Sequence, residues 1–420
     1  MFKLNKELVN GSIILLIAFN IFNFLNFIFQ FIMARLMSPE EYGTLAALFS
    51  IVYVSGMFSD SIQTIVTKYS SKEKDKGKLK NLFKRMYRKT LIMSVVLFIL
   101  FLIGAIVLAN IWETRYILIA ITGLVIFPSI LSPISRGIMQ GRKRFSSLGG
   151  NLISEAGIKI FLTSLLVILG LSVFGVVIGL VIAMGLAFFI STFQIKDILK
   201  SKEKNMALSS IYQQSILIFI FTLALTLFYS LDVIIAKAVF SPEIAGYYAI
   251  ASILGKIAFW GTQPISRAML PIASEKTEIS LKNKKLKHVF RSSLLILTLG
   301  LLAVLVVFYE FPELIIRLFS GKDLIFASQI LFRTGLAMAI LAYSNLLLYY
   351  KIATSSQEKN IANNQTKSLV YKALFFVFII IFEFVILYNS KTDLISFSNG
   401  LILSAIIFLI GSFVIFYHKK

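Results

Sequence analysis

Charged and amide side chains interrupt several long apolar segments of this chain, and in one segment they follow a helical spacing. Lys256, Trp260, Gln263 and Arg267 recur at intervals of four, three and four residues. Side chains at that spacing share one face of an α-helix. Ionisable groups within a membrane segment are costly and typically face a cavity or a polar partner. The pattern therefore predicts a polar, functional face on this segment.

Other apolar segments carry polar residues at similar intervals. Asn151, Glu155 and Lys159 lie four residues apart, an order that suits a Glu–Lys pair on one helix face. Because polar groups in hydrocarbon usually face a cavity or a partner helix, we expect these faces to meet at a central cleft. The polar residues that we expect to line this cleft are Asn23, Gln30, Asn151, Trp260 and Gln263.

The deep ionisable residues are mostly basic, and a net positive cleft favours an anionic substrate such as a phosphate or pyrophosphate. A carboxylate in a medium of low dielectric constant can exchange protons. We therefore expect coupling to H+ or Na+ through Asp60, Glu155 or Asp232. The predicted substrate-binding residues of the cationic cleft are Lys159, Lys256, Arg267, Arg333 and Arg136.

Other interpretations of these charges stay open at this point. Arg136 and Arg267 lie near the predicted cytoplasmic ends of their segments, from which long side chains extend to the membrane interface. Glu155 and Lys159 can pair with each other instead of serving a substrate. Glu383 lies near a predicted outer helix end, where we expect it to be solvated.

Composition places the chain among integral membrane proteins. Of its 420 residues, 58% are hydrophobic and 15% are charged, whereas soluble domains average about 25% charged residues. The mean hydropathy is +0.86. With no cysteine and only two histidines, we expect no disulfide, metal site or cofactor. The net charge of +22 lies mostly in short loops, which favours contact with anionic lipids over nucleic-acid binding.

Apolar segments of about 20 residues, long enough to cross a bilayer, recur along the whole chain. Alternate loops hold 30 Lys and Arg residues on one side and six on the other. By the positive-inside rule, both termini are expected in the cytoplasm of a multi-pass cell-membrane protein. We predict an all-α fold with twelve spans, near 11–33, 43–66, 90–109, 116–139, 148–170, 173–195, 209–235, 245–272, 292–311, 323–350, 368–388 and 394–417.

A repeated phrase divides the chain into halves. Ser-Pro-Glu-Glu-Tyr-Gly ends at Gly43, and Ser-Pro-Glu-Ile-Ala-Gly ends at Gly246, 203 residues later. Six predicted spans separate the two copies, so both halves enter the membrane the same way round, as a parallel repeat. We predict two six-helix lobes, residues 1–200 and 201–420, with the substrate site between them.

The phrase itself suits a short outer turn. Pro and Glu favour the first turn of a helix, and Gly permits a close approach of two backbones. We therefore expect a structural role for both copies.

The stretch SRGIMQGRKRF, from Ser135, resembles the Arg-Gly-x-x-Gln-Gly-x-x-x-Phe motif of polysaccharide flippases. Asp232, with the following SPEIAGYYAIA and PISRAMLPIAS, resembles the second half of the same proteins, which belong to the multidrug/oligosaccharidyl-lipid/polysaccharide exporter superfamily. The resemblance implies a two-lobed, V-shaped bundle that works by alternating access without ATP. It also implies movement of polyprenyl-diphosphate-linked oligosaccharides to the outer leaflet. The residues on the motif positions are Arg136, Gly137, Gln140, Gly141 and Phe145.

We therefore expect a flippase for lipid-linked oligosaccharides, and not an enzyme. A multidrug or cation antiporter of the same superfamily and a flippase for peptidoglycan lipid precursors are the alternatives. A membrane glycosyltransferase or ligase is disfavoured, because no loop is long enough for a catalytic domain. The expected partners are the lipid-linked substrate and anionic lipids, with glycan-assembly enzymes as further candidates. The chain is expected to act as a monomer.

Overall fold

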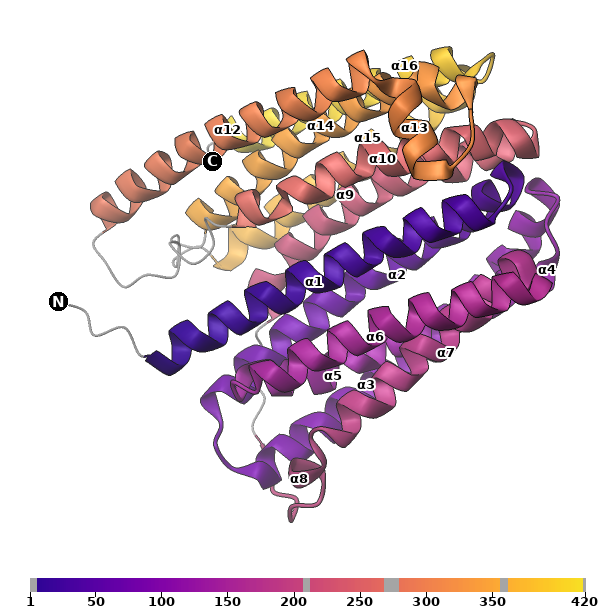
Figure 1. Ribbon diagram of the computed structural model, residues 1–420. Coiled ribbons are helices and arrows are strands. Elements are labelled where there is room, and N and C mark those ends of the chain that lie inside the picture. The colour runs from indigo at the N-terminus through magenta and orange to yellow at the C-terminus, as the bar shows by residue number, and fades with distance from the viewer. Residues whose placement is uncertain (1–5, 207–211, 268–278, 356–361, 418–420) are drawn as a thin grey trace. The chain divides into compact units, whose positions relative to one another are not determined.

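Helices account for all the regular structure in the described part of the chain. The computed structural model describes the backbone of residues 6–206, 212–267, 279–355 and 362–417 (Figure 1). A helix satisfies its own backbone hydrogen bonds, which a chain within lipid requires. The predicted all-α class is confirmed. The helices are α1 (Lys6–Leu36), α2 (Pro39–Lys72), α3 (Lys76–Ile111), α4 (Tyr116–Gly123), α5 (Ile126–Gly141), α6 (Phe145–Leu166), η1 (Val167–Leu171), α7 (Ser172–Phe193), α8 (Lys196–Leu199), α9 (Tyr212–Val239), α10 (Pro242–Arg267), α12 (Ile279–Glu310), α13 (Pro312–Ser320), α14 (Ile325–Ser355), α15 (Ala362–Asn389) and α16 (Leu394–Tyr417).

Ten helices among the described residues are long and apolar enough to cross a membrane. The segment Phe145–Phe193, counted once among the ten, contains two helices, α6 and α7, joined at Gly170, whose φ is 87°, and packed against each other. They correspond to the predicted spans 148–170 and 173–195. Another apolar helix, Leu374–Asn389, is shorter than the ten. The protein is therefore a multi-pass membrane protein. The total of twelve spans and the cytoplasmic placement of both termini stay predictions.

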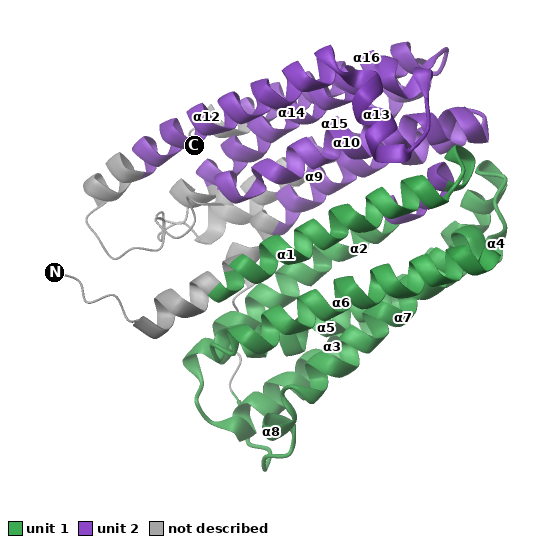
Figure 2. Ribbon diagram, in the orientation of Figure 1, with its two compact units in different colours: residues 1–41, 51–215 green, residues 42–50, 216–420 purple. Residues whose placement is uncertain are grey.

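The chain forms two compact units (Figure 2). Unit 1 comprises residues 1–41 and 51–215, and unit 2 comprises residues 42–50 and 216–420. Residues 42–50 of α2 thus belong to unit 2, whereas its first three residues and its remainder from residue 51 belong to unit 1. In unit 1, α6 packs against α1 and α7; in unit 2, α14 packs against α10 and α16.

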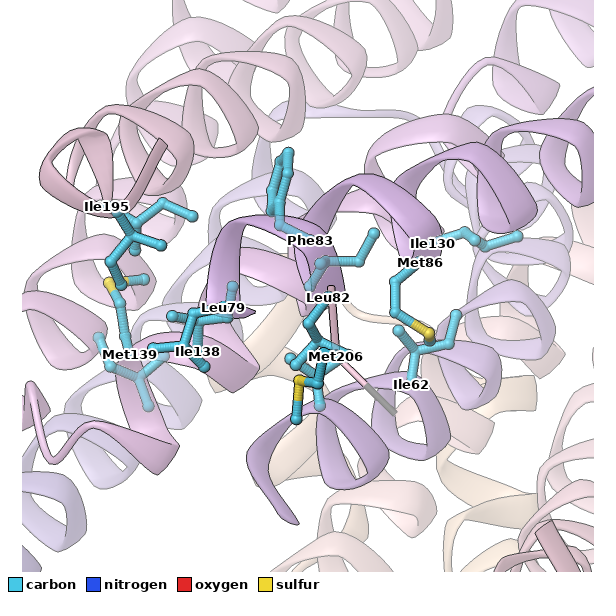
Figure 3. Close-up of a cluster of buried hydrophobic side chains, with 14 of the residues drawn as sticks. Ile62, Leu79, Leu82, Phe83, Met86, Ile130, Ile138, Met139, Ile195 and Met206 are labelled. Carbon is cyan, nitrogen blue, oxygen red and sulfur yellow. The ribbon is translucent and has the colours of Figure 1, made fainter. Parts of the chain in front are cut away.

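A cluster of buried hydrophobic side chains holds the segment after α7 within unit 1 (Figure 3). Leu79 and Leu82 of α3 are fully buried in it, as is Ile195, and Ile198 and Met206 are buried beside them. Burying such a side chain away from water contributes about 1.5–3 kcal/mol. Residues 195–206 are therefore a packed part of unit 1.

Ion pairs fasten the same segment at its surface. The guanidinium of Arg144 donates to Asp197 Oδ1 at 2.8 Å and to Oδ2 at 2.6 Å, and Lys76 Nζ lies 2.9 Å from Asp197 Oδ2. The hydrogen bond from Arg144 holds the pKa of the Asp197 carboxyl well below its usual range. Lys204 Nζ adds a pair with Asp75 Oδ2 at 2.6 Å.

Replacing Asp197 with Asn should lower the free energy of unfolding by about 1 kcal/mol, since the charges involved are partly solvated. A carboxyl with a lowered pKa stabilises the fold above its ordinary pKa and ceases to do so on acidification. The loss in Asp197→Asn should therefore be seen at neutral pH and shrink in acid. Thermal unfolding of the detergent-solubilised protein measures it. Lys200→Ala, an exposed change nearby, is the control, and an equal effect of both variants would contradict the prediction.

The glycines that end the two copies of the repeated phrase meet in unit 2. A Cβ atom built on Gly43 would lie 2.8 Å from the backbone N of Gly246. Both glycines belong to unit 2, because residues 42–50 of α2 are part of it. Ser38 caps α2, since its Oγ accepts from Glu41 N at 3.2 Å while Glu41 Oε2 accepts from Ser38 N at 2.8 Å. The predicted structural role, a helix start followed by a close backbone approach, is confirmed.

Gly43→Ala should destabilise the protein by about 1–3 kcal/mol, because the added methyl group has no space beside Gly246. Gly246→Ala should act in the same direction. Gly56→Ala is the matched control within α2: a Cβ at Gly56 meets nothing within 4 Å. Thermal unfolding distinguishes the variants, and equal melting temperatures for Gly43→Ala and Gly56→Ala would show the prediction to be wrong.

Candidate functional site

A buried ion pair joins α9 to α10 within unit 2. Lys256 Nζ lies 2.9 Å from Asp232 Oδ1, and the two side chains are 3% and 0% exposed. Ser252 Oγ donates to Asp232 Oδ2 at 2.6 Å, the Tyr248 hydroxyl donates to the same oxygen at 3.2 Å, and the backbone N of Val233 donates to Oδ1 at 2.7 Å. Buried charges persist where an opposite charge and further hydrogen bonds satisfy them.

This pairing extends the predicted polar stripe of α10 in the direction of its N-terminus. Tyr248, Ser252 and Lys256 are spaced by four residues and all contact Asp232. The sequence pattern identified Lys256 and Asp232, but not their contact or the two hydroxyl partners. The role of Lys256 in substrate binding stays a prediction. In the structure, its ammonium group contacts Asp232.

The rest of the α10 stripe is more accessible. Trp260 and Gln263 are partly exposed, and the Trp260 ring meets Tyr229 edge-on with 6.1 Å between ring centroids. Arg267 is the last described residue of α10, and its side chain lies outside the described residues.

In unit 1, Arg136 of α5 ties together three helices. Its Nε donates to Asn151 Oδ1 of α6 at 2.8 Å, and its guanidinium forms an ion pair with Glu155 of the same helix. Asn151 Nδ2 in turn donates to the backbone oxygen of Ala187 in α7 at 2.8 Å. Glu155 therefore forms its direct ion pair with Arg136, while its charge acts on Lys159 only at longer range.

Lys159 is buried against α1 instead. Its Nζ donates to the side-chain oxygen of Asn26 and lies 4.4 Å from the centre of the Phe29 ring. Both direct partners are uncharged, and Glu155 of the same helix acts on the ammonium group without a direct contact. Lys159 differs in this respect from Arg136 and Lys256, which are also buried but each contact a carboxylate.

The Arg-Gly-x-x-Gln-Gly motif packs α5 against α2 within unit 1. Gln63 Nε2 donates to Gln140 Oε1 at 2.9 Å, and Thr67 Oγ1 donates to the same oxygen at 3.2 Å. A Cβ on Gly141 would lie 2.1 Å from Ser70 Oγ, so only glycine allows this contact. The motif residues that the resemblance singled out thus hold two helices together.

The remaining predicted residues lie apart from these two pairs. Gln30 of α1 donates to the Tyr53 hydroxyl of α2 at 3.3 Å, and Asn23 and Asp60 are exposed. Arg333 of α14 is partly exposed and donates to the backbone oxygen of Gln329 at 2.7 Å. The structure groups the predicted residues within each unit, and a common cleft stays a prediction.

One buried carboxyl was assigned to the wrong environment. Glu383 of α15 is 1% exposed, so the expectation that it is solvated near an outer helix end is wrong. Neither of its carboxyl oxygens has a hydrogen-bonding partner among the described residues. The sequence feature that could have indicated this buried position is a single acidic residue inside the apolar run from 374 to 388.

Breaking the Arg136–Glu155 pair from one side should be more harmful than removing it. Arg136→Met leaves a nearly buried carboxylate without its cation, which costs about 3 kcal/mol or more. The double variant Arg136→Met/Glu155→Met should recover part of that loss. A double-mutant cycle of unfolding free energies tests this, and additive single effects would contradict a direct pair.

Comparison with solved structures places the fold among membrane transporters. The lipid II flippase MurJ, in an inward closed conformation, is 15% identical, with a TM-score of 0.66 over 96% of this chain and 87% of that chain. The MATE multidrug transporter DinF-BH is 15% identical, with a TM-score of 0.62 over 99% of this chain and 98% of that chain.

Comparisons of sequence identify relatives of this chain in addition to its fold. An uncharacterized membrane protein of Methanocaldococcus jannaschii is 26% identical over 421 residues, which cover 94% of each chain. The family model described as polysaccharide biosynthesis protein matches residues 32–328. That match spans the capped start of α2, the Arg136 motif and the Asp232–Lys256 pair. The chain therefore belongs to the polysaccharide biosynthesis protein family, on the fold shared by the flippases and multidrug transporters of the MOP superfamily.

Proposed function

We propose that this protein is an alternating-access flippase that moves polyprenyl-diphosphate-linked oligosaccharides from the cytoplasmic to the outer leaflet, for synthesis of surface polysaccharide or glycoprotein. The observation that carries the proposal is membership of the polysaccharide biosynthesis family on a fold similar to that of the lipid II flippase MurJ. Since the family and its structural neighbours are transporters and flippases, the proposed activity forms and breaks no glycosidic bond.

The distribution of buried charge supports an anionic headgroup. Arg136 and Lys256 are each balanced by a carboxylate, whereas Lys159 contacts a neutral amide and an aromatic ring. A buried ammonium without a direct anionic contact is costly, and an anionic headgroup beside it would offset that cost. A diphosphate has several acceptor oxygens, so it can add a charge-assisted hydrogen bond to the one that Lys159 makes with Asn26. We infer that Lys159 contributes more to substrate binding than the paired cations do.

Transport is proposed to require no cofactor and to be driven by an H+ or Na+ gradient. Of the predicted coupling carboxylates, Glu155 and Asp232 are each engaged by a basic residue, and Asp60 lies exposed on α2. The protein is proposed to act as a monomer among anionic lipids.

Lys159→Met should slow flipping by about tenfold or more, which corresponds to the loss of one charge-assisted hydrogen bond. The measurement uses proteoliposomes that contain a fluorescent polyprenyl-diphosphate oligosaccharide, with dithionite quenching of the outer leaflet. Methionine fills much of the volume of the lysine stem without its charge. Lys200→Met, an exposed change in the segment after α7, is the control for expression and insertion.

The rival activities give distinct outcomes in the same vesicles. Transport of a cationic dye without movement of the lipid-linked oligosaccharide would replace the proposal by multidrug transport. Movement of a peptidoglycan lipid precursor in preference to the oligosaccharide would narrow the substrate to that lipid. A wild-type flipping rate in Lys159→Met would show that Lys159 is not part of the binding site.

A further inference from the structure

The short helix α13 (Pro312–Ser320) connects two membrane spans of unit 2. The span on α12 ends at Glu310, and the span on α14 begins at Ile325. The backbone of Phe311, with φ −128° and ψ 42°, interrupts the helical chain between α12 and α13, so α13 runs in a different direction from α12 (Figure 1). Because one span ends where α13 begins and the next begins after it, α13 lies at one surface of the membrane.

A helix is not required to connect two spans at this place. In the first half of the chain, the third and fourth spans lie on α3 and α4, which are joined by residues 112–115 alone. The second half inserts a complete helix between the corresponding spans. The presence of α13 therefore needs an explanation other than the connection of α12 to α14.

One face of α13 is buried within unit 2. Ile316, Phe319 and Ser320, at positions i, i+3 and i+4, are buried, and the helix packs against α14. Pro312 begins α13, and Gly321, whose φ is 71°, ends it. These contacts fix the rotation of the helix about its axis and so determine which residues its other faces present.

A second apolar face of α13 is exposed. Leu314 and Leu318 are 53% and 58% exposed, and Phe311, at the helix start, is 55% exposed. These three residues follow the spacing i, i+3, i+7, which places them on one side of a helix. Since the removal of apolar surface from water is favourable, this face favours an apolar partner outside the protein.

A charged stripe runs beside the exposed apolar face. Glu313 and Arg317 are four residues apart, and both are exposed. Arg317 Nε lies 3.5 Å from Asp323 Oδ1, but these side chains are 70% and 75% exposed, and an ion pair in water is weak. The guanidinium can therefore also contact a lipid phosphate. An apolar face beside a charged one is typical of helices that lie in the interface between a membrane and water.

Exposed apolar side chains continue on both spans that α13 connects. Val306 and Tyr309, near the end of α12, are 58% and 66% exposed, and Ile325 and Phe326, at the start of α14, are 62% and 57% exposed. In a membrane span such side chains face lipid, and tyrosine is enriched where the membrane meets water. The surface that covers the apolar face of α13 is therefore the same lipid that covers the ends of the two spans.

We propose that α13 is an interfacial helix that lies in the plane of the bilayer surface and anchors unit 2 to it. The partner is the lipid bilayer. Leu314, Leu318 and Phe311 enter the upper part of the acyl chains, and Arg317 lies at the level of the lipid phosphates. The anchor concerns the contact of unit 2 with the membrane, so it holds whichever substrate the protein transports.

Spin labelling of the full chain in liposomes of phosphatidylcholine and phosphatidylglycerol tests the proposal. The chain has no cysteine, so a single introduced cysteine carries the only nitroxide. Labels at Leu314→Cys and Leu318→Cys should be accessible to oxygen, which concentrates in lipid, and should lie about 5–10 Å below the lipid phosphates. A label at Glu313→Cys should instead be accessible to a water-soluble nickel chelate. Val306→Cys, on the exposed face of α12, is the reference for a label in lipid.

Two results would overturn the proposal. If nickel reached the labels at Leu314 and Leu318 as readily as the label at Glu313, α13 would be surrounded by water. If the two leucine positions were protected from both reagents, a protein partner such as a second copy of the chain would cover this face instead of lipid. The use of two leucine positions keeps the test decisive if one labelled variant fails to fold, and the melting temperature of each variant identifies such a failure.

Discussion

Within a hydrocarbon layer, a buried charge needs an opposite charge or several hydrogen bonds, because its transfer from water costs several kcal/mol per ion. The helices of this protein are arranged so that most buried charges meet that requirement. Arg136 of α5 takes Glu155 of α6, and Lys256 of α10 takes Asp232 of α9. Each pair joins two helices. The same contact therefore holds the two helices together and balances one positive charge with one negative charge.

Among the described residues, Lys159 in unit 1 and Glu383 in unit 2 are buried without a direct ion pair. Lys159 contacts the Asn26 amide and the Phe29 ring, and Glu155 acts on its ammonium only at longer range. Neither carboxyl oxygen of Glu383 has a hydrogen-bonding partner in the described part of the chain.

Much of the fold follows from the sequence because long apolar segments leave the backbone few choices. The helices, the capped turn at Ser38 and the close approach of the glycines that end each repeated phrase were all predictable from local patterns. The predicted spans 148–170 and 173–195 likewise correspond to α6 and α7, which Gly170 separates with a positive φ of 87°. The sequence pattern locates helices more reliably than it locates their ends, since α6 ends at Leu166 and α7 begins at Ser172.

The site was only partly predictable, because pairing between helices depends on their packing. Spacing by four residues favoured a Glu155–Lys159 pair, but Arg136 on another helix has the better geometry. The environment of Glu383 was misjudged. Its position near a predicted helix end suggested contact with water, whereas neighbouring side chains bury it. A single sequence contains the residue types of such a cluster, but not the side-chain contacts that decide their charge.

The contact between Gly43 and Gly246 has a consequence for the origin of the chain. The two glycines occupy equivalent positions in the two copies of the repeated phrase, and their backbones approach each other closely. In a half-length ancestor, the same residue would have met its own copy across a two-fold axis, as in an isologous dimer interface. Duplication and fusion of the gene would then preserve the contact while releasing the two copies to diverge.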